Sequence, residues 1–159
     1  MRHRRAVFYV NKEFFVLVDE GIGSAAGSAN LSFNLCRYES EVEYDANEMG
    51  AHTTFTDNNI VVRTFTNETA TFNEMEGRVA YVVKNDVFDK RKAYQIKINK
   101  LANKTARFIT VIYPCKKTEG QTIEAVFTDN GYSANGASIK VTINGIEYPL
   151  SYILQSNNF

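Results

Sequence analysis

The stretch HRRAVFYVNKEFFVLVDE, residues 3–20, decides the fold of this chain. Two apolar runs flank Asn11-Lys12, a pair typical of a turn between strands. In the second run, residues 14–18, alternate side chains point to opposite faces of a sheet, and both sets are apolar up to Asp19. The pattern predicts a β-hairpin whose second strand is central in its sheet and covered on both sides.

The rest of the chain repeats this organisation. Short apolar or alternating runs are separated by turns rich in Gly, Asn and Asp, and no run has the 3.6-residue period of a helix. We therefore predict an all-β fold, an antiparallel β-sandwich of about ten to twelve strands, as a single domain over residues 1–159. The predicted strands are 6–10, 14–18, 29–36, 52–55, 60–65, 79–83, 93–98, 108–113, 123–127, 138–143 and 146–154.

The last two predicted strands form the clearest hairpin. Asn144-Gly145 suits a two-residue turn because both positions tolerate a positive φ. Lys140 and Thr142 alternate with apolar residues, which indicates one face in water. Pro149 donates no hydrogen bond to a neighbouring strand, so it predicts an edge strand.

Composition limits the classes of function. The 159 residues include eleven Phe and nine Tyr but no Trp, and the formal net charge is zero. A neutral chain is not drawn as a whole to nucleic acid or to an anionic membrane, so we expect neither as a partner. The sequence contains no membrane-spanning apolar run and no signal peptide. Cys36 and Cys115 suggest two buried free thiols, with a disulfide as the alternative.

Few residues are candidates for catalysis. The sequence has two histidines, His3 and His52, and it lacks a nucleophile elbow, a phosphate-binding glycine loop and a zinc-finger spacing. His52 lies in an alternating run, which favours a half-exposed strand histidine. The glycine-rich stretch 21–30 precedes no helix and is interpreted as a flexible connection between strands. His3 with the two arginines after it is a solvated start, a ligand contact, or one ligand of a metal ion completed elsewhere.

The segment 76–97 is the best candidate for binding. It interleaves basic side chains with aromatic rings, a combination that suits an anionic sugar polymer, although Asp86 and Asp89 would neutralise part of its charge. The alternative is a solvated loop without a ligand. The candidate substrate-binding residues are Arg78, Tyr81, Lys90, Arg91 and Lys92.

Three stretches carry a resemblance to a known family. They are the opening HRRAVFYVNKEFFVLVDEGIGSAAGSANLSF, ARFITVIYPCKK at 106–117, and IKVTINGIEYPLSYIL at 139–154. Together they resemble the C-terminal region of the heparinase II/III-like polysaccharide lyases, closest to the heparinase III-type heparan-sulfate lyases of Bacteroides-like bacteria. The resemblance spans essentially the whole chain and is loose from about 38 to 73.

The resemblance implies a function. Such lyases split acidic polysaccharides by β-elimination, with catalytic groups in an N-terminal α-helical toroid and in sandwich structure upstream of HRR. The chain is then a C-terminal fragment without a catalytic residue, inactive alone, whose partners are an acidic polysaccharide and that toroid. A periplasmic or secreted location follows from the family. His3 is the one position that matches a metal ligand of some relatives, for zinc or calcium, with the other ligands outside the chain.

Two departures from the family leave alternatives open. The segment 78–92 carries Asp86 and Asp89 and lacks a Trp near Arg78, which leaves less sulfated or uronate-rich polymers as alternative substrates. The alternative functions are a free-standing carbohydrate-binding sandwich and a purely structural module.

Overall fold

The computed structural model describes residues 1–35, 41–79 and 89–154, with the backbone alone for 78, 79 and 89–91. Twelve strands and one short 3₁₀ helix, η2 (Ala46–Glu48), make up the described secondary structure. The strands are β1 (Arg2–Val10), β2 (Phe14–Ile22), β3 (Gly27–Asn34), β4 (Val42–Asp45), β5 (Gly50–Thr53), β6 (Asn59–Thr66), β7 (Ala70–Val79), β8 (Asp89–Lys100), β9 (Ala106–Cys115), β10 (Ile123–Phe127), β11 (Gly136–Ile143) and β12 (Ile146–Ile153).

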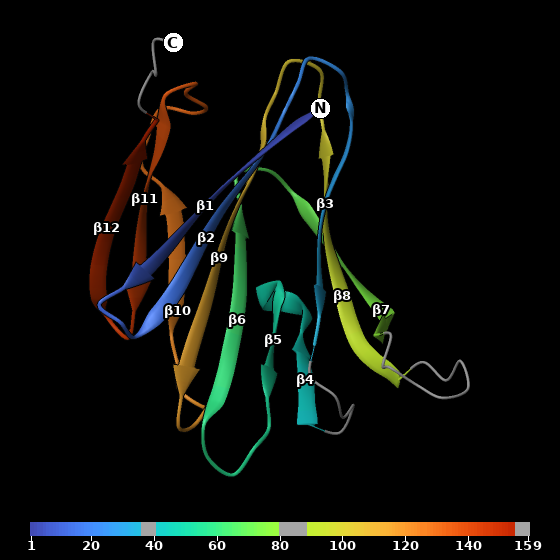
Figure 1. Ribbon diagram of the computed structural model, residues 1–159, viewed down its shortest axis with the longest axis vertical. Helices are drawn as coiled ribbons and strands as arrows, with labels where there is room; N and C mark the ends of the chain where they lie inside the picture. Colours follow the sequence, from blue (N-terminus) through green and yellow to red (C-terminus); the bar gives the residue numbers. More distant parts are fainter. Residues whose placement is uncertain (36–40, 80–88, 155–159) are drawn as a thin grey trace.

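These strands form three sheets, and every pairing between neighbouring strands is antiparallel. A central sheet has the order β1-β2-β9-β6-β5-β4, and two smaller sheets have the orders β10-β11-β12 and β3-β8-β7 (Figure 1). The prediction of an all-β, antiparallel sandwich of about ten to twelve strands is therefore confirmed.

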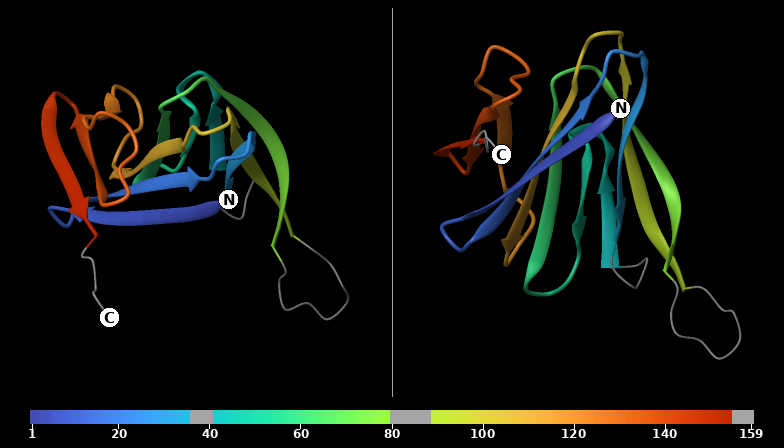
Figure 2. Two further views of the ribbon diagram at one scale, coloured as in Figure 1. Left: turned by 90° about the horizontal axis from the view of Figure 1, so that it is seen from above. Right: turned by 45° about the horizontal axis from the view of Figure 1, so that its top comes forward.

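The two small sheets lie on opposite faces of the central sheet. Along β9, Ile109 and Val111 belong to a core shared with β10–β12, whereas Ala106 and Phe108 belong to a second core shared with β3 and β8. Since alternate strand residues point to opposite faces, the two cores lie on either side of β9. Figure 2 shows the small sheets displaced toward opposite ends of the central sheet.

Each small sheet therefore covers only half of its face. The first core includes Phe14, Val16 and Val18 of β2, so β10–β12 lies over β1, β2 and β9. The second core includes Val42 and Ala51, so β3-β8-β7 lies over β4, β5 and one end of β9. Each face of the central sheet consequently keeps one half open.

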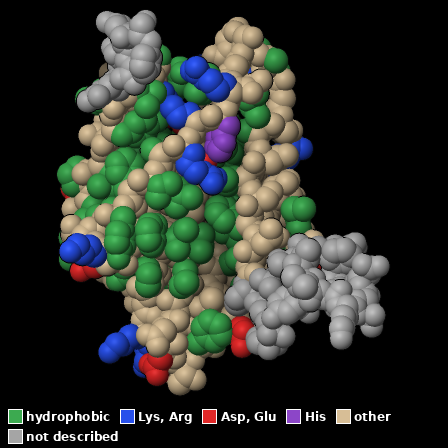
Figure 3. Space-filling view, in the orientation of Figure 1, with side chains coloured by type: hydrophobic (Ala, Val, Ile, Leu, Met, Phe, Trp, Pro, Cys, Tyr) green, Lys and Arg blue, Asp and Glu red, His purple; other side chains and the backbone are tan. Residues whose placement is uncertain are grey.

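The open half on the side of the second core is apolar. The register aligns Tyr9, Phe15, Ile112 and Val62 in one row across four strands, with Val7 and Leu17 in the row beside it. We call these six residues the apolar half. Val7 is 60% exposed, Tyr9 57% and Phe15 40%, and Figure 3 shows hydrophobic side chains gathered over β1 and β2.

The open half on the side of the first core is charged. Arg63 is paired with Val111 of the first core, and Gly50 and His52 of β5 lie on the same face. Glu43 is paired with His52, and Asp45 follows two residues later. We call Glu43, Asp45, His52 and Arg63 the charged half.

A buried ionic cluster fastens β10–β12 to the central sheet. Glu20 is fully buried and its carboxylate accepts from Arg107 Nε at 2.9 Å, Arg4 Nε at 2.6 Å and the Tyr152 hydroxyl at 2.9 Å. The Arg107 guanidinium also donates two hydrogen bonds to Asp129, at 2.6 and 2.7 Å. A bidentate pair of this kind fixes the orientation of both groups.

The pKa values in this cluster follow from these contacts. The hydrogen bonds from Arg107 hold the pKa of Asp129 below its usual value. Burial, followed by the hydrogen bond to Glu20, raises the pKa of Tyr152 to about 12. Asp129 is therefore ionised at neutral pH, while the Tyr152 hydroxyl keeps its proton.

The structure also corrects details of the predicted strands. The β2 strand is central in its sheet, but the prediction that it is covered on both sides was wrong, because Phe15 faces the open apolar half. The β4 strand was missed, and the predicted strand 79–83 lies outside the described residues beyond Val79, where β7 ends. The final hairpin is confirmed: Asn144 and Gly145 both have positive φ, and β12 is an edge strand.

Candidate functional site

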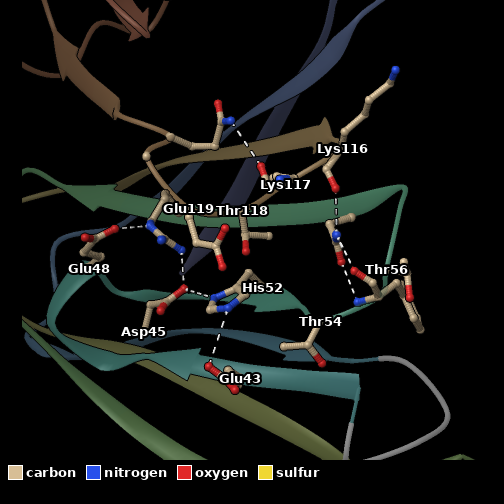
Figure 4. A pocket seen from close by; sticks show the side chains of 15 residues that line it. Glu43, Asp45, Glu48, His52, Thr54, Thr56, Lys116, Lys117, Thr118 and Glu119 are labelled. Atoms are coloured by element: carbon tan, nitrogen blue, oxygen red, sulfur yellow. Dashed lines mark hydrogen bonds and ion pairs between the residues drawn. The ribbon is translucent and has the colours of Figure 1, made fainter.

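A polar cleft of about 780 Å³ opens over the charged half. One wall comes from β4, β5 and β6, and the other comes from the connection after β9 (Figure 4). Carboxylates, a guanidinium, an imidazole and two ammonium-bearing side chains line it. Its charged and titratable lining residues are Glu43, Asp45, Glu48, His52, Arg63, Lys116, Lys117 and Glu119.

Asp45 joins His52 and Arg63 in the wall formed by β4, β5 and β6. Its Oδ2 lies 2.7 Å from Nδ1 of His52 and accepts a hydrogen bond from Nη1 of Arg63 at 2.6 Å. Arg63 also donates from Nε to Glu48, and Glu43 lies 3.7 Å from Nε2 of His52. The prediction that His52 lies on a strand is confirmed by its place in β5, but its side chain is only 17% exposed and so is more buried than predicted.

The buried side-chain amide of Asn59 holds the second wall, the segment after β9, in place. The side chain of Asn59 accepts from the backbone N–H of Phe55 at 2.7 Å and donates to the carbonyls of Phe55 and Lys116 at 2.9 and 3.0 Å. These bonds tie the turn between β5 and β6 to the segment after β9. Phe55, which is 39% exposed, lines the same cleft as Lys116 and Lys117.

The cleft suits binding of a polar ligand more than bond-breaking chemistry. His52 and Arg63 are already engaged by carboxylates of the chain. Among residues 1–35, 41–79 and 89–154, no group of three or more His, Cys, Asp or Glu side chains could hold a metal ion. The exposed Lys116 and Lys117 remain as cations that a polar or anionic ligand could reach.

The predicted basic segment is only partly described. The β7–β8 register pairs Arg78 with Lys90, Gly77 with Arg91 and Glu76 with Lys92. Arg78 and Lys90 are therefore cross-strand neighbours, which the sequence did not predict because β7 was missed. Tyr81 lies outside the described residues.

Lys92 is the one predicted binding residue whose side chain is described. Its ammonium donates to the carbonyl of Val42 at 2.8 Å and lies 5.4 Å from the ring centroid of Tyr44. These contacts hold β8 against β4. The Lys92 charge is thus engaged within the chain rather than free on the surface.

His3 lies on the opposite face from the cleft, beside the apolar half. Its Nε2 is 2.6 Å from Oδ1 of Asp19, and Arg5 donates to both oxygens of the same carboxylate at 2.7 and 3.1 Å. The His3 side chain is 59% exposed. The described residues around it do not fit a metal site by themselves.

The sequence did not predict that the residues of the cleft lie close together. Asp45, His52 and Arg63 come from three strands, and only the β4–β5–β6 register brings them together. The available signal was a charged or titratable residue in each of three short consecutive segments.

The cysteines lie outside this cleft lining. Cys115 carries a free, half-buried thiol whose pKa is raised by burial, and Cys36 lies outside the described residues.

Comparison with known proteins gives one consistent match. The family model described as heparinase II/III-like, C-terminal, matches residues 1–125. The chain is 53% identical to a heparin-sulfate lyase of Bacteroides thetaiotaomicron over 97% of its own length, and 30% identical to one of Bacteroides stercoris. It spans 22% and 23% of these two proteins, respectively.

Solved structures give the same result. A crystal structure of heparinase III is 53% identical, superposes with a TM-score of 0.92, and is matched over 96% of this chain and 23% of that one. A heparan sulfate lyase from Pedobacter heparinus is 25% identical with a TM-score of 0.83, over 99% of this chain and 24% of that one. The described residues contain no helix long and apolar enough to cross a membrane.

Proposed function

Because the chain belongs to the heparinase II/III-like family, in its C-terminal part, we propose that it is the single C-terminal β-sandwich domain of a polysaccharide lyase. The observation that carries this proposal is 53% identity to a heparin-sulfate lyase over nearly the whole chain. The parent protein would cleave an acidic polysaccharide by β-elimination. The names of the relatives make heparan sulfate the first substrate to test.

In this proposal the chain alone is not a catalyst. Elimination needs a base, an acid and a group that neutralises the uronate, all assembled at one sugar. Both histidines are held by carboxylates of the chain, His3 by Asp19 and His52 by Asp45. The catalytic groups would therefore come from an N-terminal α-helical toroid and the structure between it and this domain. Its main role would be to support those parts.

The contribution to substrate binding comes from the basic hairpin β7–β8. The register sets Arg78 beside Lys90, and Arg91 is the next residue. Neighbouring cations attract sulfate and carboxylate groups, in a manner weakened by salt. Arg78, Tyr81, Lys90 and Arg91 are the proposed contacts, and Lys92 would act by anchoring β8 through Val42.

Two further parts of the proposal concern the parent protein. A polymeric substrate outside the cell implies a periplasmic or secreted enzyme. His3 would serve a structural metal ion only with ligands from outside this chain, because the described residues hold no group that could bind one.

The test is retention of the chain on immobilised heparan sulfate and on an unsulfated uronate polymer, at low and moderate salt. We expect salt-sensitive retention on heparan sulfate that is lost in the variant Arg78→Gln/Lys90→Gln/Arg91→Gln. The matched control is Lys104→Gln/Lys116→Gln/Lys117→Gln, which removes the same charge, partly from the polar cleft. Loss of retention in the control alone would place binding in the cleft and contradict the assignment to β7–β8.

The same samples test catalysis. We expect no unsaturated uronate product from the 159-residue chain, and product formation from the longer protein that contains it. Product formation by the chain alone would show that its own side chains complete the reaction. Failure of the longer protein on every acidic polysaccharide would reject the lyase assignment.

A further inference from the structure

The sheet β3-β8-β7 turns one face to the second core and leaves its other face open in the part of the chain that the structure describes. Ile96 and Ile98 of β8 are fully buried in that core, so Lys97 between them points outward. The outward residues of the three strands align in cross-strand rows. The two central rows contain Asn30, Lys97 and Thr71, and Ser32, Gln95 and Asn73. We call these six residues the amide face.

The composition of the amide face is unusual for a strand surface in water. Asn is depleted in strands, yet Asn30 and Asn73 lie on this face, and Asn34 and Asn99 occupy the rows on either side. Solvated surfaces usually mix charges of both signs, whereas Lys97 is the one charged residue among these six. Residues that break a local preference are expected at functional sites, so this face is a candidate for binding.

The side chains of the amide face suit the hydroxyl groups of a sugar. An amide offers a carbonyl oxygen that accepts and an NH₂ group that donates, and a hydroxyl does both. Gln95 Nε2 donates to Ser32 Oγ at 3.2 Å, which confirms that these two side chains share the face. The side chains of Asn30, Thr71 and Asn73 have no hydrogen-bond partner among the described residues, and the three are exposed. Their polar groups are therefore available to a ligand.

Lys97 adds a positive charge to this surface. Its ammonium has no ion pair among the described residues, and its neighbours on the face, Asn30, Thr71, Gln95 and Asn99, are uncharged. An ammonium without a carboxylate beside it attracts the carboxylate or sulfate of a ligand. The face thus complements a hydroxyl-rich chain that carries negative groups. It has none of the aromatic side chains that are enriched where proteins bind each other.

We propose that the amide face binds the sugar chain of an acidic polysaccharide and continues the contacts made at the basic hairpin. This inference rests on the proposed function, because it gives the substrate of that function a second contact surface. Strands β7 and β8 belong to both surfaces, and the six residues from Arg91 to Lys97 span about 20 Å of β8. The amides and hydroxyls bind sugar hydroxyls, and Lys97 binds an anionic group of the same polymer.

A second copy of this chain fits the amide face less well than a sugar polymer does. In a symmetric dimer the same patch of each copy meets its equivalent. Two amide faces in contact would bring two Lys97 side chains together and would bury no apolar centre. Like charges that face each other oppose such a contact.

The test is the affinity of the 159-residue chain for a heparan sulfate oligosaccharide, measured by calorimetry at low and moderate salt. Asn73→Ala/Gln95→Ala should weaken binding about tenfold, as expected for two lost hydrogen bonds. The factor should be similar at both salt concentrations, because salt screens charges and these groups are neutral. Lys97→Gln should weaken binding about threefold at low salt and less at moderate salt. Unchanged affinity of Asn73→Ala/Gln95→Ala would overturn the proposal.

The matched controls lie on the outer face of β10-β11-β12. Thr142 and Lys140 alternate there with the buried Val141, and Ser151 is exposed on β12. Thr142→Ala/Ser151→Ala and Lys140→Gln should leave the affinity within about twofold, as expected for surface changes away from a site. Urea denaturation checks that every variant remains folded. A loss in the controls equal to that in the amide face would overturn the proposal.

Side-chain NMR signals give a second measurement that needs no variant. Adding the oligosaccharide to the unchanged chain should shift the NH₂ signals of Asn30, Asn73 and Gln95. Asn144, whose NH₂ group donates to Gln121 at 2.8 Å, is the internal reference and should not move. Amide-face signals that stay in place at saturation would overturn the proposal. Signals that move when only the protein concentration rises would identify a second copy as the occupant and would also overturn it.

These results separate this inference from the proposed function. If Arg78→Gln/Lys90→Gln/Arg91→Gln abolishes retention while the amide-face variants bind normally, the amide face is rejected and the hairpin assignment stands. In the longer protein, Asn73→Ala/Gln95→Ala should raise KM about tenfold with kcat unchanged, because it removes binding that ground state and transition state share. An unchanged KM would overturn the inference. A longer protein that binds through the amide face but forms no unsaturated product would support the inference and reject the lyase assignment.

Discussion

The two open halves of the central sheet have opposite chemistry although they share strands. Along β6, Val62 belongs to the apolar half and its neighbour Arg63 to the charged half. The charged half neutralises itself with internal ion pairs and can remain in water. The apolar half exposes aromatic rings in a row, as a protein interface does. From this difference we expect the charged half to remain exposed to solvent and the apolar half to be covered by a partner.

The largest effect should separate a covered residue from an open one on the same strand. Phe14 is 1% exposed and Phe15 is 40% exposed. Phe14→Ala should lower the free energy of unfolding of the 159-residue chain by about 3–5 kcal/mol, because it leaves a cavity in the first core. Phe15→Ala should cost about 1 kcal/mol or less. Urea denaturation measures both, and equal losses would mean that the apolar half is already covered in the isolated chain.

The next effect concerns the ionic cluster under β10–β12. Asp129 has a lowered pKa in the folded chain, so its contribution to stability is present above its unfolded pKa and is lost as pH falls through the folded value. Asp129→Asn should cost about 1.5–3 kcal/mol near neutral pH, since it weakens a charged hydrogen-bonded pair. The free energy of unfolding of the variant should also fall less steeply with decreasing pH than that of the unchanged chain. Unfolding curves between neutral and strongly acidic pH test this, and an unchanged acid limb would contradict it.

The ion pairs of the charged half should matter less. Arg63 donates to Asp45 and Glu48 beside an open cleft, where water can replace part of each interaction. Arg63→Met should cost about 1–2 kcal/mol. Lys140→Met, which removes the exposed pair with Glu147, is the control and should cost less than about 0.5 kcal/mol. If Arg63→Met instead costs as much as Asp129→Asn, water does not replace these ion pairs, and the prediction is contradicted.

The smallest effect should have the opposite sign. The Tyr94 hydroxyl is buried under β3-β8-β7 and has no hydrogen-bond partner among the described residues, and its pKa is raised, chiefly by burial. The ring stacks between Phe33 and Phe72. Tyr94→Phe should therefore raise the free energy of unfolding by about 1 kcal/mol. A destabilised variant would show that the hydroxyl has a partner, such as a buried water molecule.

Most of the strands and the final hairpin could be predicted from the sequence because both depend on local patterns. Alternation marks which side chains share a face, and Asn144-Gly145 marks a tight turn. Coverage of a face is not local: Phe15 is as apolar as Phe14, and only the offset of the small sheets leaves it open. The short β4 was missed because its charged residues interrupt the apolar pattern.

The candidate site was less accessible to the same reasoning. The basic side chains of β7–β8 form a compositional signal that is visible in one segment. The cleft depends on register, because Asp45, His52 and Arg63 come from three strands. The amide face requires the sheet order, which sequence patterns do not specify.

The most direct test is hydroxyl-radical footprinting of Tyr9 in the 159-residue chain and in the longer protein that contains it. Tyr9 is 57% exposed and lies in the apolar half, whereas Tyr132, 36% exposed and packed on Arg4, serves as the internal reference. We expect strong oxidation of Tyr9 in the short chain and protection in the longer protein, with Tyr132 unchanged. Equal oxidation of Tyr9 in both proteins would contradict the expectation that the rest of the longer protein covers the apolar half.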